Sequence, residues 1–395
     1  EARAPERRGG TGRRLLPLIY HDIATLQNTN QMDASSVRIR PGAGLKTEDV
    51  AGGAERPAVR LHGQFTVTSQ KEESGLEPKL VRTVCGDLAP EALGWCQIHE
   101  HIFVHDTPAA QGNPALRIDD FVRSLAELKA YRACGGTSLC DAQPVAAGRD
   151  CEMLARLSGE SGVVIVASTG YHLPVFYAPD CWVDRLEEEA LYDLYCEELT
   201  LGMLLHTEDP TARPRQRSDI RAGMVKAAIG KDGPAGRLGT LLRAAARAAA
   251  DTGSVLMLHT ERGMHVGEAV ELARECGLPA RRMIVCHVDR QAEDFGPHEA
   301  AAKTGVWLDY DTIGRFRYHS DEAEVKLIRH MADCGYGGQL LFALDTTAAR
   351  LGAYGGEISL RYLHDTFLPR LREAGLEQVG LAATGEHCRQ VFETL

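Results

Sequence analysis

The chain has 395 residues, of which 44% are hydrophobic and 25% charged, and its formal net charge is -11. This composition is typical of a soluble globular protein, and no apolar run approaches the roughly 20 residues that a membrane span needs. The negative charge and the lack of a sustained basic stripe exclude a nucleic-acid partner.

The cysteines indicate a cellular compartment. There are eleven of them, an odd number, and no two form a C-x-x-C pair. Several lie in apolar runs, where a thiol packs as a small hydrophobe. We therefore predict a reducing environment and a cytoplasmic location.

The N-terminal region differs from the rest of the chain in its pattern of apolar residues. Residues 1–79 show no periodic apolar pattern and carry glycine and arginine clusters, so we predict a disordered tail or a mis-started segment there. From Leu80 onward, short β-branched or apolar runs alternate with longer amphipathic stretches. This alternation is typical of βα units around a parallel sheet.

Eight strands are predicted in this second region. They cover residues 96–104, 136–141, 163–169, 224–229, 254–259, 283–287, 305–310 and 339–345. Helices are predicted between them, for example over 119–133 and 237–251, which are followed by Gly135 and Gly253. The pattern predicts an α/β fold, a (β/α)8 TIM barrel over residues 80–395, with a doubly wound open sheet as the alternative.

Polar residues stand where several of these buried strands end. His99 and His101 are two positions apart, so both imidazoles lie on one face of their strand. His259, His287 and Asp345 each end a further strand. A core histidine or a helix N-cap is the alternative for each position alone, but together they predict side chains that meet at the C-terminal mouth of the barrel.

Imidazole and carboxylate ligands suit zinc, manganese, cobalt or iron, and we take zinc as the working assignment. A bound divalent ion lowers the pKa of water from about 15.7 to about 7, and Asp345 can accept the proton. Lys226 is unusual because a lysine inside an apolar strand is costly. It either snorkels toward solvent or has a chemical function.

The order H-x-H, strand lysine, His, His, Asp resembles the phosphotriesterase family of the amidohydrolase superfamily. Residues 86–88, 93–94, 168–171, 221–223 and 367–371 resemble further landmarks of that family. The resemblance implies that carbon dioxide carboxylates Lys226 and that the carbamate bridges two divalent ions. It also implies that His99, His101 and Asp345 hold one ion, and that His259 and His287 hold the other.

Residues 309–318 and 354–356 resemble the branch that opens lactones of phosphorylated sugars. Where members that hydrolyse phosphotriesters carry an acidic relay residue, this chain has Arg290, with Asp289 beside it. Arg317 fits the basic phosphate-binding position of the lactonase branch, whereas Ala348 and Leu351 occupy its other two positions. Our candidate substrate-binding residues are Tyr171, Arg290 and Arg317. Packing is the alternative for Tyr171, and a solvated loop position is the alternative for Arg317.

We therefore expect an enzyme that opens a lactone, with or without an anionic group, by attack of a metal-bridging hydroxide with Asp345 as proton acceptor. Hydrolysis of a phosphotriester or an N-acyl amide is the alternative on the same metal site, and a non-catalytic binding barrel is a further one. The expected partner is a small-molecule substrate, without nucleic acid or membrane, and a homodimer is kept as an open assembly state.

Overall fold

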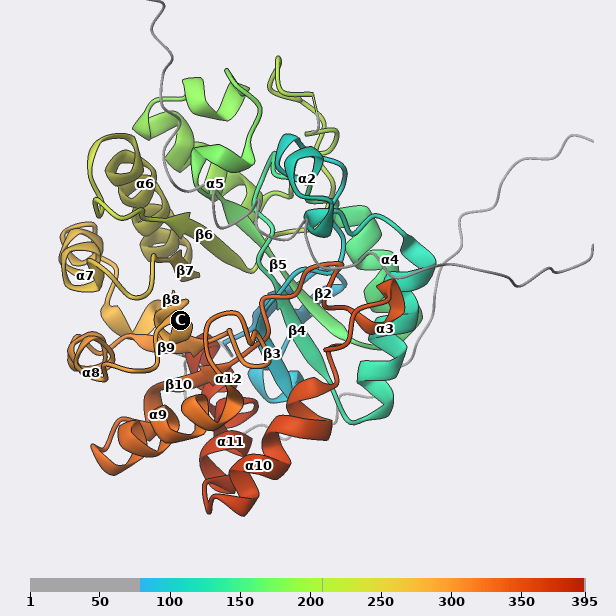
Figure 1. Cartoon of the computed structure of the whole chain (residues 1–395). Coiled ribbons are helices and arrows are strands. Elements are labelled where there is room, and N and C mark those ends of the chain that lie inside the picture. The colour runs from blue at the N-terminus through green and yellow to red at the C-terminus, as the bar shows by residue number, and fades with distance from the viewer. Residues whose placement is uncertain (1–78, 208, 394–395) are drawn as a thin grey trace, which may run out of the picture. The chain divides into compact units, whose positions relative to one another are not determined.

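The computed structural model describes residues 79–207 and 209–393. The tail predicted over residues 1–79 therefore lies outside the described residues, except for Lys79. Eight parallel strands stand at the centre and helices surround them (Figure 1). The strands are β3 Cys96–Glu100, β4 Ser138–Asp141, β5 Val164–Gly170, β6 Met224–Ala228, β7 Val255–His259, β8 Met283–Cys286, β9 Trp307–Tyr310 and β10 Leu340–Phe342.

Helices alternate with these strands along the chain. They are α2 Pro108–Gly112, α3 Phe121–Ala133, α4 Cys151–Ser161, α5 Glu188–Thr200, α6 Gly236–Thr252, α7 Val266–Glu275, α8 Gly296–Lys303, α9 Asp321–Asp333, α10 Leu368–Glu373, α11 Glu377–Ala383 and α12 Glu386–Glu393. A short antiparallel hairpin, β1 Val81–Thr83 and β2 Gly86–Leu88, precedes the barrel. No helix in the described part of the chain has the length and apolar character needed to cross a bilayer.

Each strand pairs in parallel with the next, in the order β3 to β10. The two ends of this sheet also meet, because the Asp345 amide after β10 donates to the His99 carbonyl of β3 at 3.1 Å. The predicted (β/α)8 barrel is therefore confirmed, and the open-sheet alternative is wrong.

Local chemistry explains the helix boundaries. The Asp120 side chain accepts from the Arg123 amide at 3.1 Å and so caps the start of α3. Gly253 adopts a left-handed conformation, with φ 69°, and ends α6 as the sequence predicts.

Four predicted strands end earlier than expected, and the one predicted over 224–229 stops at Ala228. Residues 101–104 leave the sheet, because Val104 bridges to Ile118 and Arg149 instead. The strands predicted to end at His287 and Asp345 stop at Cys286 and Phe342. Positive φ angles of 66° at His287 and 47° at Asp345 turn the backbone out of the ladder.

The interior of the barrel is closed at one end. Apolar side chains from most of the strands fill it, including those of Ile98, Met224 and Leu341. Val391 and Phe392 of α12 belong to the same cluster and seal the N-terminal end of the strands. The C-terminal mouth is thus the end at which polar side chains can meet a ligand.

Candidate active site

All six predicted metal ligands converge at the C-terminal mouth. His99 Nε2 lies 3.8 Å and His101 Nε2 3.4 Å from the same oxygen of Asp345, Oδ1. Lys226 Nζ lies 3.2 Å from His99 Nε2. The centres of the His259 and His287 rings are 4.5 Å apart, and the His287 ring lies 5.2 Å from that of His99.

Two of these residues are aimed by unusual backbone geometry. His287 and Asp345 both have positive φ, which residues other than glycine adopt rarely and mostly at functional sites. Each is the point where the chain turns from a buried strand into a loop. The turn places the side chain over the mouth of the barrel, beside the other ligands.

A buried carboxylate that we did not predict orients two of the histidines. Asp311 accepts from His287 Nδ1 at 2.7 Å and from His99 Nδ1 at 3.0 Å. Asp309 also lies 2.9 Å from His99 Nδ1. Because Nδ1 of each ring faces a carboxylate, Nε2 is left as the ligand atom. Two acids, two positions apart where an apolar strand ends, were the sequence signal for this pair.

Burial keeps the histidines in the form that binds metal. Burial, followed by the charge of Lys226, lowers the pKa of His99 to about 4. Burial also lowers the pKa values of His259 and His287. All three rings are therefore neutral at pH 7 and have a free lone pair.

The surroundings of His259 indicate whether these residues fit a metal ion. Its ring is 96% buried, yet neither ring nitrogen has a hydrogen-bond partner. The nearest carboxylate, that of Glu261, is 3.5 Å from Nε2. Unpaired buried imidazole nitrogens are costly, and a divalent ion satisfies them. The donor set, of imidazole and carboxylate, therefore fits a divalent metal ion.

Lys226 does not snorkel to the surface. It is only 1% exposed, and its Nζ contacts His99 and, at 4.0 Å, Cys286 Sγ. Among the described residues no carboxylate forms an ion pair with it. A buried ammonium without a direct ion pair is expensive, and the charge of Lys226 acts only through space on a carboxylate such as that of Asp309.

Glu100, between His99 and His101, fastens the end of β3 to the segment that carries Asp345. Its carboxylate accepts from the Leu344 amide at 2.8 Å and from the Thr346 hydroxyl at 2.7 Å. Burial raises its pKa to about 7. The contacts hold His99, His101 and Asp345 at a fixed separation.

Two arginines reach the outer oxygen of Asp345. Arg315 Nη1 lies 3.0 Å and Arg290 Nη2 3.5 Å from Oδ2. Burial by itself would raise the pKa of Asp345. The charge of Arg315 and the contact with His101 outweigh this effect and hold the pKa well below its usual range. Arg290 was predicted to lie near the substrate, whereas Arg315 was not singled out.

The other substrate-binding candidates lie differently. Arg317 is exposed and donates to the hydroxyl of Tyr318 at 2.9 Å, with its guanidinium over that ring. Tyr171 is 1% exposed, stacks on Tyr177 at 4.0 Å and donates to Asp184. These contacts match the alternatives of loop position and packing, and a substrate role for either residue stays a prediction.

Two further polar residues near the mouth have structural contacts. His172, which follows Tyr171 in the chain, lies against His259, with ring centres 4.6 Å apart. Arg350 is buried and donates to the carbonyls of Leu344 and Ile313. It therefore braces the loops after β9 and β10.

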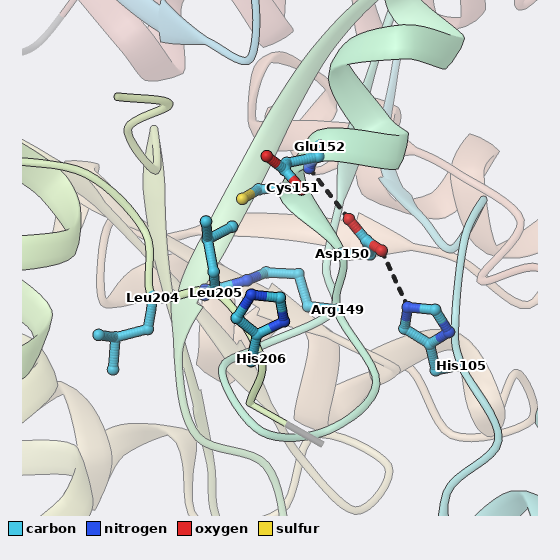
Figure 2. A pocket seen from close by; sticks show the side chains of 8 residues that line it. All are labelled: His105, Arg149, Asp150, Cys151, Glu152, Leu204, Leu205 and His206. Atoms are coloured by element: carbon cyan, nitrogen blue, oxygen red, sulfur yellow. Dashed lines mark hydrogen bonds and ion pairs between the residues drawn. The ribbon is translucent and has the colours of Figure 1, made fainter. Parts of the chain in front are cut away.

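A small cavity of about 80 Å³ lies beside the start of α4 (Figure 2). It is lined by His105, Arg149, Asp150, Cys151, Glu152, Leu204, Leu205 and His206. The guanidinium of Arg149 is already paired in two contacts of 2.7 Å with Glu198. Its charge is therefore compensated, and none of the predicted metal ligands lines this cavity.

Comparisons with known proteins agree with this geometry. A model of the phosphotriesterase family matches residues 79–388. The chain is 26% identical over 317 residues to a phospho-furanose lactonase of Mycoplasmopsis synoviae, covering 77% of this chain and 88% of the relative. It is 27% identical over 349 residues to an N-acetyltaurine hydrolase of Tetraodon nigroviridis, covering 75% and 93%.

A solved structure supports the same assignment. The crystal structure of a lactonase from Listeria monocytogenes matches with a TM-score of 0.71 and 25% identity, covering 79% of this chain and 98% of that one. The family match spans the whole barrel from Lys79 to Cys388 and includes all six converging side chains. The chain therefore belongs to the phosphotriesterase family of hydrolases.

Proposed function

We propose that this enzyme opens a lactone that carries an anionic group. The observation that carries this proposal is the pair of arginines, Arg290 and Arg315, on the outer oxygen of Asp345. Two guanidinium groups converge on one carboxylate there, so this part of the mouth is rich in positive charge, which Glu261 offsets only in part because it acts on Arg290 alone. An anionic group of a substrate would compensate this charge through charge-assisted hydrogen bonds.

Two divalent ions would be held at the mouth, zinc being the first expectation. His99, His101 and Asp345 would hold one ion, and His259 and His287 the other. When bound, the ions supply Lewis acidity and make water acidic enough to attack near neutral pH. The unpaired nitrogens of His259 and the Nε2 atoms left free by Asp311 support this assignment.

Lys226 would join the two halves of this centre as a carbamate. The neutral amine forms a bond to the carbon of carbon dioxide and loses one proton, and an anion replaces a buried cation. The lack of an ion-pair partner for Lys226 among the described residues supports this step. A carbamate oxygen is also a better ligand than an ammonium group, which cannot coordinate.

Asp345 is suited to accept a proton once substrate is present. Its Oδ1 faces the histidines, whereas its Oδ2 faces the arginines that lower its pKa. A substrate anion that engages Arg290 and Arg315 would draw this positive charge away. The pKa of Asp345 would then rise, and the carboxylate would become a stronger base when the substrate is bound.

Amide hydrolysis is a second candidate on the same site. An N-acylated amino sulfonate has an anion that the same two arginines could bind, and one group of relatives is named for hydrolysing N-acetyltaurine. A phosphotriester is a poorer candidate because Arg290 stands where an acidic relay residue is expected. We also keep the cytoplasmic location and a homodimer as predictions.

The experiment is a substrate screen with zinc-loaded enzyme. It compares a phosphorylated sugar lactone, its dephosphorylated counterpart, N-acetyltaurine and an aryl phosphotriester. We expect the highest kcat/KM for the phosphorylated lactone, about 10- to 100-fold above the neutral one, since a hydrogen bond to a charged group contributes about 1.5–3 kcal/mol. Preference for the amide would select the second candidate. Equal turnover of both lactones would overturn the anionic assignment.

A further inference from the structure

A second group of metal-ligating side chains lies on the outside of the barrel, at helices α8 and α9, which are neighbours there (Figure 1). His330 Nε2 is 2.9 Å from Glu299 Oε1 and 3.6 Å from Cys334 Sγ. One ligand atom from each of these three residues lies within 4.8 Å of the other two. None of the three belongs to the site at the barrel mouth.

The fold holds these side chains in place. His330 and Cys334 are four positions apart, so they lie one turn from each other on the same face of α9. Cys334 caps that helix, and its amide donates to the His330 carbonyl at 2.9 Å. Phe295 stacks on the His330 ring, with centres 4.4 Å apart. The second oxygen of Glu299 faces Lys303 at 3.4 Å, which leaves Oε1 for His330.

The spacing matches a tetrahedral ion. With a Zn–S distance of about 2.3 Å and a Zn–N distance of about 2.0 Å, two ligand atoms lie about 3.5 Å apart. The Cys334–His330 distance already has this value. The 2.9 Å contact between His330 and Glu299 needs to open only slightly. Both of these side chains are 30% exposed, so an ion can reach them from solvent.

We propose that Cys334 Sγ, His330 Nε2 and Glu299 Oε1 bind a divalent ion of the zinc class, with water at the fourth position. A thiolate, an imidazole and a carboxylate form a donor set typical of zinc. Binding releases the proton of the Cys334 thiol, so affinity rises with pH. The ion joins α8 to α9, and the proposal does not depend on the reaction at the barrel mouth.

A similar group elsewhere provides a matched control. Cys134, His364 and Asp365 also lie within 4.8 Å of one another. There, however, the thiol donates to the Tyr131 carbonyl at 3.1 Å, and His364 contacts its own sequence neighbour Asp365. His364 is also 44% exposed, and the Trp95 ring against it lies slightly farther away and is more tilted, at 4.9 Å and 39°. This group is less well prepared for an ion.

Cobalt titration tests the proposal by a spectroscopic signal. Enzyme loaded with only two equivalents of zinc per chain, the number proposed for the barrel mouth, is titrated with Co²⁺, and thiolate-to-cobalt charge-transfer absorption in the near ultraviolet is recorded. We expect a signal that saturates at one further ion per chain. Cys334→Ser should abolish it, and His330→Ala should weaken the affinity by at least about tenfold. Cys134→Ser should leave it unchanged.

Circular dichroism and thermal melts without cobalt check that each variant folds. We expect folded proteins, because none of the three substituted side chains is fully buried. Turnover by Cys334→Ser should equal that of the unmodified enzyme, because the barrel mouth is untouched. No thiolate absorption in the unmodified enzyme would overturn the proposal. Absorption that survives Cys334→Ser or disappears in Cys134→Ser would also overturn it.

Discussion

At the scale of single residues, the mouth of the barrel is organised by pairs that share one partner. Asp311 contacts Nδ1 of both His99 and His287, so one carboxylate sets the ring orientation of two ligands. Arg290 and Arg315 share Asp345 in the same way. Such sharing couples the residues, and a change in one partner alters the charge that the other experiences.

The first prediction concerns Arg315 and Arg317, which are two positions apart but lie in different surroundings. Arg315→Ala should lower kcat/KM for an anionic lactone by about 10- to 100-fold, because a charge-assisted hydrogen bond is lost. Arg317→Ala should change it little, since Arg317 is exposed and contacts Tyr318. Steady-state kinetics on matched anionic and neutral lactones measure both effects.

The neutral lactone is the control for this prediction. Arg315→Ala should lower the kcat/KM of the neutral lactone far less than that of the anionic one, and the change that remains measures the effect of Arg315 on Asp345. Arg315→Lys should restore part of the activity on the anionic substrate. An equal loss on both lactones would show that Arg315 acts through Asp345 and does not bind the substrate. If only Arg317→Ala lowered kcat/KM for the anionic lactone, Arg317 would be the residue that binds the substrate anion, as the sequence indicates.

At the scale of elements, the close pairing of β5 with β6 depends on one glycine. Gly170 has a φ of 98° and pairs with Lys226 in the sheet. A Cβ atom at this position would lie 1.9 Å from the Lys226 carbonyl oxygen. The strand that carries Lys226 can therefore pass this close to its neighbour only because position 170 has no side chain.

The second prediction is that Gly170→Ala destabilises the protein and disturbs the metal site. The backbone conformation alone costs about 1–3 kcal/mol for a residue with a side chain, and the clash adds to this. We expect a lower Tm and less bound metal, measured by calorimetry and elemental analysis. Gly159→Ala in α4, where a Cβ meets nothing within 4 Å, should instead be neutral or slightly stabilising. Equal melting of the two variants would contradict this account.

At the scale of the whole molecule, the metal centre connects distant parts of the chain. Its proposed ligands come from β3, β6 and β7 and from the segments that follow β8 and β10. Two ions held by these ligands would restrain the barrel across its mouth, opposite the end that α12 seals. Metal loading should therefore be visible in global stability as well as in turnover.

The third prediction concerns removal and return of the metal. Stripping with a chelator should lower Tm by on the order of 5 °C, because a ligand at 100 times its Kd stabilises the native state by about 2.7 kcal/mol. Adding zinc with bicarbonate should restore Tm and turnover. Adding zinc without carbon dioxide should restore less of both, because Lys226 then lacks its carbamate. Lys226→Met should not respond to bicarbonate, and identical recovery under both conditions would contradict the carbamate.

Local patterns in the sequence were sufficient to predict the eight strands and five of the six side chains that converge, whereas the role of Lys226 was implied only by the family resemblance. The reason is periodicity: a buried apolar run that ends in His or Asp places that residue at the mouth of any parallel barrel. The predicted strand ends were less accurate, because the positive φ angles of His287 and Asp345 depend on loop contacts. Only the tertiary structure placed Asp311 between two histidines and brought Arg315 rather than Arg317 to Asp345. Such contacts join residues from separate βα units, and their distances depend on how the barrel closes and how its loops pack, which no single segment encodes.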